Sequence, residues 1–119
     1  MVYTGGTRAL AALEMLVHLT TPLSRAKTYR ILEIKIPAEL VDHYPAKALP
    51  KDWREAPPGK STMQIGDDWL RAGRQLALSI PSIIIPEEHN LLLNPQHREF
   101  AKLQISEALN FHFDPRLGQ

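Results

Sequence analysis

LALSIPSIIIPEEHNLLLNP, residues 76–95, is the stretch around which the rest of the chain is organised. Its pattern predicts an apolar strand that Pro81 interrupts, that resumes over residues 83–85, and that a second proline then ends. A buried strand that twice gives up a backbone donor is costly as mere scaffold, which favours a functional role for the serine beside the first break. We therefore expect Ser82 at the edge of a pocket, with the polar loop Glu87–Asn90 helping to frame it.

Length and charge limit the kind of protein. The 119 residues predict one domain, residues 1–119, around a single core. An apolar fraction of 44% and a net charge of +1 are typical of a soluble globular protein, and they give no electrostatic footprint for direct nucleic-acid or membrane binding. No apolar run approaches the ~18 residues of a membrane span, and the first residues lack the basic and apolar pattern of a secretory signal, so none is expected. We expect a cytoplasmic protein.

Cysteine and proline usage add two constraints. The chain has no cysteine, which excludes disulfides, thiol catalysis and cysteine metal ligands. Its ten prolines fall mostly at the ends of predicted elements. This composition predicts a loop-rich α+β domain.

Periodicity and turn signals divide the chain into short elements. The predicted helices cover residues 8–19, 38–44, 61–71 and 95–102, and the predicted strands cover residues 1–4, 28–36, 76–85, 103–106 and 110–113. Thr7 is expected to cap the first helix, and Gly73 to end the third. The proline-rich residues 45–59 are expected to form a long ordered loop over the surface, and residues 114–117 a closing turn.

Glu14 stands out on the first predicted helix. On the helical wheel it lies between Leu10 and Val17 of the apolar stripe, so it borders the buried side instead of opposing it. A plainer interpretation is a carboxylate on the flank of the helix that pairs with His18 four residues later. Both interpretations stay open at this point.

Motifs for common chemistries are weak or missing. The five histidines show neither HExxH nor His-x-His, so no metal site is expected. Ser82 lies in SIPSI and not in a G-x-S-x-G elbow, which favours a substrate-binding hydroxyl over a nucleophile. Residues 5–7 precede a helix N-terminus that could hold an anion, although a plain turn and cap is the stronger interpretation. Arg71 and Arg74 flank one helix end and make no basic stripe, so nucleic-acid binding is not expected.

A series of short motifs follows in a fixed order along nearly the whole chain. They are VYT (2–4), TRALAALE (7–14), LPKDWR (49–54), IGDDWL (65–70), IPS (80–82), EHNLLLNP (88–95) and FDPRL (113–117). In this order the motifs strongly resemble the RES-domain family, the toxin components of RES–Xre toxin–antitoxin pairs.

The resemblance implies a fold, an activity and a partner. RES domains are similar in fold to ADP-ribosyltransferase toxins, with a mixed sheet and short helices around an NAD-binding cleft. Members degrade NAD+ by cleaving the nicotinamide–ribose bond, with water or phosphate as acceptor, and some pass ADP-ribose to a protein. The resemblance therefore implies NAD+ as substrate, without a metal. It also implies an Xre-family helix-turn-helix antitoxin as partner and homo-oligomers within the toxin–antitoxin complex.

The resemblance also implies which residues act. Glu14 matches the family glutamate, Ser82 the family serine and Tyr3 the tyrosine of the preceding strand, so these three are the expected catalytic set. Glu14 would stabilise the oxocarbenium-like ribose or orient the acceptor. Tyr3, Thr7, Ser82 and Asn90 are the expected contacts to NAD+, with Tyr3 stacking on the nicotinamide or ribose and Thr7 lying near the phosphates.

One part of the family pattern has no match. The family's arginine belongs to a segment upstream of Val2, and Arg8 on the first helix does not correspond to it. We therefore expect that the N-terminal part of the family domain is absent from this chain, together with its clamp on the pyrophosphate. Two functions follow as alternatives: an NAD+-consuming toxin, or a non-catalytic module that binds an antitoxin or binds NAD+ without cleaving it.

Overall fold

The computed structural model describes residues 1–54 and 60–118. Its strands are β1 (Val2–Gly5), β2 (Tyr29–Ile31), β3 (Ile34–Lys35), β4 (Val41–His43), β5 (Ala77–Pro81), β6 (His89–Leu93), β7 (Gln104–Ile105) and β8 (Leu109–Phe111). Its α-helices are α1 (Arg8–Leu16), α2 (Pro22–Ala26) and α3 (Lys60–Ala72). Short 3₁₀ turns cover Ala38–Leu40, Ala46–Ala48, Phe100–Lys102 and Pro115–Gly118. Within the described residues, no helix is both long and apolar enough to cross a membrane.

A four-stranded mixed sheet forms the centre of the molecule, which confirms the predicted α+β class with a mixed sheet. The strand order is β1-β6-β5-β4, with β4 parallel to β5 and the other pairs antiparallel. β5 and β6 are the inner strands, and their apolar side chains provide most of the buried core, among them Leu78, Leu92 and Leu93. An inner strand is covered on both faces, which explains why this part of the sequence is almost continuously apolar.

Helix α1 packs against β1 at very short range. A side chain at Gly5 would place its Cβ 2.7 Å from the backbone nitrogen of Ala11, so only glycine fits at this contact. Thr7 caps the helix as predicted, because its hydroxyl accepts a hydrogen bond from the Leu10 nitrogen at 3.1 Å. The helix ends at Leu16, one turn earlier than predicted, where tighter backbone bonds of the 3₁₀ type close it.

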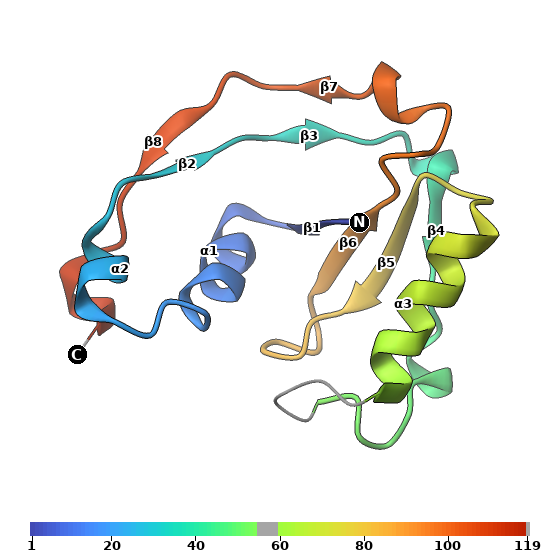
Figure 1. Ribbon diagram of the computed structural model, residues 1–119, viewed down its shortest axis with the longest axis horizontal. Helices are drawn as coiled ribbons and strands as arrows, with labels where there is room; N and C mark the ends of the chain where they lie inside the picture. Colours follow the sequence, from blue (N-terminus) through green and yellow to red (C-terminus); the bar gives the residue numbers. More distant parts are fainter. Residues whose placement is uncertain (55–59, 119) are drawn as a thin grey trace.

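A long two-stranded ribbon runs apart from the central sheet (Figure 1). β2 pairs with β8 and β3 pairs with β7, both antiparallel. Edge-to-face contacts of Phe113 with Tyr29 and Phe111, at centroid distances of 5.9 and 5.0 Å, anchor one end of this ribbon. The C-terminal 3₁₀ turn lies beside α2 at that same end.

Several predicted elements differ from the observed ones. The predicted strand 76–85 ends at Pro81, and residues 83–85 belong to the loop that joins β5 to β6. The predicted strand 28–36 is divided into β2 and β3, and the predicted helix 38–44 is a 3₁₀ turn followed by β4. Of the predicted helix 95–102, only the 3₁₀ turn at its end forms. Strand partners from elsewhere in the chain override the local pattern at 28–36 and 38–44, and prolines bound the strand predicted at 76–85.

The third helix agrees more closely with its prediction. α3 begins at Lys60, one residue before the predicted start. It ends before Gly73, whose φ of 60° is the left-handed conformation expected of a residue that terminates a helix. Residues 55–59 of the predicted surface loop lie outside the described residues.

Candidate active site

Ser82 is the centre of the turn that connects β5 to β6. Its Oγ accepts hydrogen bonds from the backbone nitrogens of Ile84 and Ile85, both at 3.1 Å. Its own nitrogen donates to the carbonyl oxygen of Glu88 at 2.9 Å. A serine hydroxyl that binds the backbone two and three residues ahead stabilises a turn, so this side chain forms the loop that two prolines begin and end.

Glu14 meets Ser82 and Asn90 at one carboxylate oxygen. Glu14 Oε1 accepts a hydrogen bond from Ser82 Oγ at 2.7 Å and one from Asn90 Nδ2 at 2.8 Å. The three residues come from α1, from the loop after β5 and from β6, separated by 68 and 76 positions in the chain. Short hydrogen bonds to a carboxylate are among the stronger ones in proteins, so they fix the direction in which Glu14 points.

The second oxygen of Glu14 is left available. Among the described residues, none donates a hydrogen bond to Glu14 Oε2. Glu14 itself is half-buried, one helical turn beyond the buried Leu10. The arrangement therefore orients a carboxylate through one oxygen and presents the other one. His18 forms no ion pair with Glu14 in the described part of the chain, so the alternative pairing is wrong.

Ser82 has no hydrogen-bonding capacity left over. A hydroxyl offers one donor and two acceptor positions, and here it donates to Glu14 and accepts from the two backbone nitrogens. Its side chain is 0% exposed. Two cavities, of about 780 and 470 Å³, lie elsewhere, and Ser82 lines neither of them. A direct contact between Ser82 and a substrate stays a prediction, whereas the observed contacts make Ser82 a residue that positions Glu14.

Asn90 is held by a single side-chain bond. Its Nδ2 donates to Glu14, while its Oδ1 is buried and has no hydrogen-bond partner among the described residues. An unpaired buried acceptor costs free energy unless water or a ligand satisfies it. The amide therefore depends on the Glu14 carboxylate for its orientation, and the two side chains form a coupled pair.

Tyr3 lies on the same face of the sheet as Asn90. In the β1–β6 pair Tyr3 is opposite Leu92, and Gly5 is opposite Asn90. Because side chains alternate along a strand, Tyr3, Leu92 and Asn90 project to one face. The Tyr3 side chain is 74% exposed, so its ring is free to stack on a ligand that approaches this face.

Thr7 and Arg54 complete the surroundings. The Thr7 hydroxyl is used by the cap of α1, so only the backbone of that first turn could serve an anion. Arg54 Nε donates to the carbonyl oxygen of Ile83 at 3.1 Å, which joins the end of the described 45–54 segment to the Ser82 turn. Within residues 1–54 and 60–118, no group of three or more His, Asp or Glu side chains could hold a metal ion.

Sequence reasoning missed two features near the site. The role of Gly5 is a close approach of helix to strand, and the only signal for it is a glycine at a strand end. On the other face of the sheet, Ser79 Oγ and His89 Nδ1 lie 3.2 Å apart. Ser79 is buried and faces away from Asn90, because residues 79 and 80 alternate and residue 80 is opposite Asn90. No sequence pattern identifies this second pair.

Comparisons with known proteins agree on one family. The RES domain profile matches residues 1–114. Toxin Res of Yersinia enterocolitica (serotype O:8 / biotype 1B) is 37% identical over 117 residues, which covers 98% of this chain and 76% of the relative. The protein named Prs ADP-ribosylating toxin, from Sphingobium sp. (strain YBL2), is 34% identical over 123 residues, which covers 98% of this chain and 74% of the relative. The chain belongs to the RES domain family.

Proposed function

We propose that this chain is a toxin that consumes NAD+ by cleaving the bond between nicotinamide and ribose. The observation that carries the proposal is the Glu14 carboxylate, which Ser82 and Asn90 hold through Oε1 while Oε2 is left available. The relatives support the biological role, since one of the two is named Toxin Res and the other Prs ADP-ribosylating toxin. An ADP-ribosylating reaction uses NAD+, which makes NAD+ the substrate of this proposal.

The chemistry needs a fixed negative charge beside the ribose. When the bond from C1′ to the nicotinamide nitrogen breaks, its electron pair stays with nicotinamide, which leaves as a neutral molecule. C1′ becomes electron-poor, and a carboxylate oriented in advance lowers the energy of that state. An acceptor oxygen or nitrogen then bonds to C1′ and releases a proton, which Glu14 can take when Oε2 faces the acceptor.

Each neighbour of Glu14 receives a role that its contacts support. Ser82 and Asn90 act through Glu14, so they are positioning residues. Tyr3 is exposed on the same sheet face and is suited to stack on the nicotinamide or the ribose. The first turn of α1, after Thr7, offers backbone N–H groups to a phosphate.

The acceptor divides the proposal into two reactions. Water or phosphate as acceptor makes the protein a glycohydrolase or phosphorylase. Transfer to a protein is the second candidate, and the name of the Sphingobium relative favours it. The exposed position of Tyr3 leaves room on this face for either kind of acceptor. As a toxin, the chain would act together with an antitoxin, which we propose to be of the Xre type.

The test follows free nicotinamide and the fate of ADP-ribose. Purified protein is incubated with NAD+, and the products are separated by chromatography and mass spectrometry with and without phosphate and a cell lysate. We expect nicotinamide release by the wild type and a loss of roughly 10²- to 10³-fold in Glu14→Gln, the size typical of a lost electrostatic contact. Glu107→Gln changes an exposed carboxylate far along the chain and should keep full activity. Equal turnover by wild type and Glu14→Gln would rule the proposal out.

A further inference from the structure

A large cavity lies away from Glu14, where α3 ends and the chain leaves β6. It has a volume of about 780 Å³, within the usual range for small-molecule sites. Asn90 is the second residue of β6 and Asn94 follows the end of this strand, so the two sites are separated by roughly 13 Å of strand at about 3.3 Å per residue. The cavity lining contains no Glu14, Ser82 or Tyr3.

Three arginines line this cavity, and none of the described residues in its lining carries a carboxylate. Arg71 lies in the last turn of α3, Arg74 follows the end of that helix, and Arg98 comes from the turn after β6. Arg71 lies 3.8 Å from Asp68, and Arg98 lies 4.0 Å from Glu99. Such long ion pairs between exposed arginines and carboxylates contribute little to stability, so a ligand can compete for both guanidiniums. Arg74 has no ion-pair partner in the described part of the chain.

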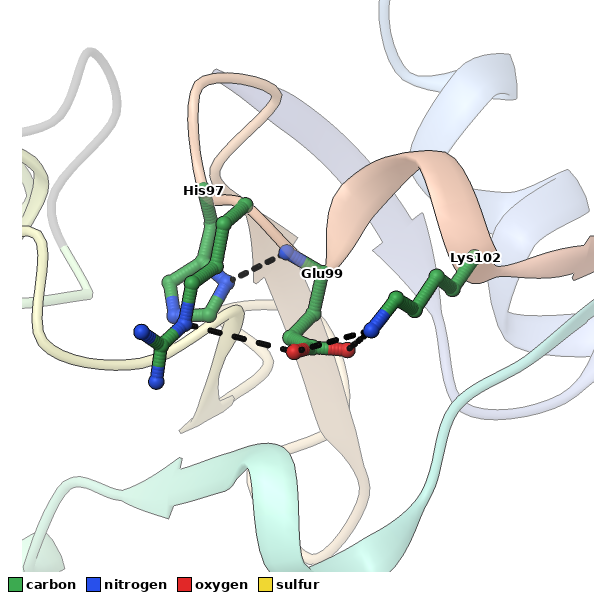
Figure 2. Close-up of polar contacts among 4 residues, drawn as sticks. His97, Glu99 and Lys102 are labelled. Carbon is green, nitrogen blue, oxygen red and sulfur yellow. Dashed lines mark hydrogen bonds and ion pairs between the residues drawn. The ribbon is translucent and has the colours of Figure 1, made fainter.

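The neutral polar groups of the cavity are also donors. The Glu99 nitrogen donates to His97 Nδ1 at 3.1 Å (Figure 2), which in the neutral ring places the proton on Nε2. Asn94 is only 4% exposed, and its Oδ1 accepts from the Gln96 nitrogen at 3.0 Å. Its amide nitrogen has no partner among the described residues and is not one of their buried unpaired atoms, so it is an accessible donor in the cavity lining.

Three nearby features oppose an anion, and one of them is the Asp68 carboxylate, 3.8 Å from Arg71. The carbonyl end of α3 carries partial negative charge, but Arg71 and Arg74 lie at the same place. The Glu99 carboxylate lies between two cations, 3.3 Å from Lys102 and 4.0 Å from Arg98, so its charge is shared with Lys102 outside the cavity lining (Figure 2). The balance of charge at the cavity is therefore positive.

We propose that this cavity binds a nucleotide through its diphosphate or triphosphate group. Arginine forks match phosphate oxygens in geometry as well as charge, and three of them suit a chain of phosphates better than a single one. Leu70, Pro95 and Met1 add apolar surface for the base and sugar. This site would act beside the proposed reaction at Glu14 and does not depend on it.

The test is binding of ATP, with inorganic triphosphate as a second probe, by isothermal titration calorimetry. We expect saturable one-to-one binding that weakens as salt is raised. Arg74→Gln combined with Arg98→Gln should weaken the affinity for ATP by about 100-fold. The loss of each charge-assisted contact to a phosphate is expected to lower this affinity about tenfold. Arg30→Gln is the matched control, because Arg30 is exposed on β2, far from the cavity in sequence. The thermal unfolding of all variants checks that they are folded.

Three results would overturn the proposal. They are no binding of ATP at millimolar concentration, equal binding by the wild type and the double variant, and binding of an acidic peptide such as oligoglutamate in place of ATP. Glu14→Gln separates the two proposals, because it should abolish nicotinamide release and leave ATP binding unchanged. If Glu14→Gln instead abolishes ATP binding, the ligand occupies the Glu14 site and the separate nucleotide site is wrong.

Discussion

At the scale of single residues, the Ser82 hydroxyl connects the turn after β5 to the catalytic candidate. It donates to Glu14 and accepts from Ile84 and Ile85 without contact to solvent. Removal of a buried hydroxyl that makes all of its hydrogen bonds lowers the stability of the protein, because its partners are left unpaired. The same atom therefore determines the stability of the loop and the direction of the carboxylate.

Ser82→Ala should lower the free energy of unfolding by about 1–3 kcal/mol, because two backbone nitrogens and one carboxylate lose a partner in a buried place. Urea denaturation with an unchanged m-value measures this loss. Ser106→Ala is the control: the Ser106 hydroxyl also accepts a backbone bond, from the Glu33 nitrogen at 2.8 Å, but the site is exposed. We expect a smaller loss there, and equal losses at both positions would contradict the importance given to burial of Ser82.

The Asp114–Arg116 pair tests local electrostatics away from the site. The Arg116 guanidinium lies beside Asp114, at 2.8 Å, and lowers the pKa of this carboxyl, with help from the Arg116 backbone nitrogen. The stabilisation is therefore present above the ordinary pKa of an aspartate and is lost as the pH falls through the lowered one. In Arg116→Gln the pKa of Asp114 should rise towards its ordinary value in an NMR titration. An unchanged titration would show that the pair does not form in solution.

At the scale of elements, the contact of α1 with β1 decides where Glu14 lies. Gly5 ends β1 against Ala11, and the Gly6 nitrogen donates to the His89 carbonyl oxygen at 3.0 Å. The helix is thereby fixed to both β1 and β6, the strand that carries Asn90. Gly5, directly opposite Asn90 on the neighbouring strand, thus controls the distance between Glu14 and the groups that hold it.

Gly5→Ala should push α1 away from β1 and cost about 1–3 kcal/mol of stability, the usual size for an overpacked contact. It should also reduce nicotinamide release, since Glu14 moves with the helix. Thr21→Ala is the matched control: Thr21 caps α2, so this change costs about 1 kcal/mol and leaves the contact of α1 with β1 intact. The temperature of unfolding and the rate of NAD+ turnover are measured for each variant. If Gly5→Ala turns over NAD+ at the wild-type rate, Gly5 does not determine the position of Glu14.

The elements themselves show how far local signals extend. Thr7 and Gly73 were predicted correctly because capping and left-handed termination depend on neighbours within a few residues. β6 was not predicted as a strand, because its first half, His89 and Asn90, belongs to a polar cluster. Its pairing with β5 is a local hairpin, but its other edge is bonded to β1, almost the whole chain away, and local pattern does not identify that partner.

At the scale of the whole molecule, the sheet brings together residues that no local pattern connects. Glu14, Ser82 and Asn90 could be chosen from the order of the motifs, and the RES family resemblance is confirmed over residues 1–114. Their mutual contacts could not be predicted, because they arise from the packing of α1 on the central sheet. For the same reason Ser82 was expected to contact substrate, whereas its observed bonds all go to the protein itself.

A double-mutant cycle on NAD+ turnover tests the central claim that Ser82 acts through Glu14. The rate of nicotinamide release is measured for the wild type, Ser82→Ala, Glu14→Gln and the double variant, with folding checked for each. If Ser82 only positions the carboxylate, the double variant will be no slower than Glu14→Gln alone, because the two changes remove one contribution. If the two losses multiply instead, Ser82 contributes to the reaction independently of Glu14, and the claim is wrong.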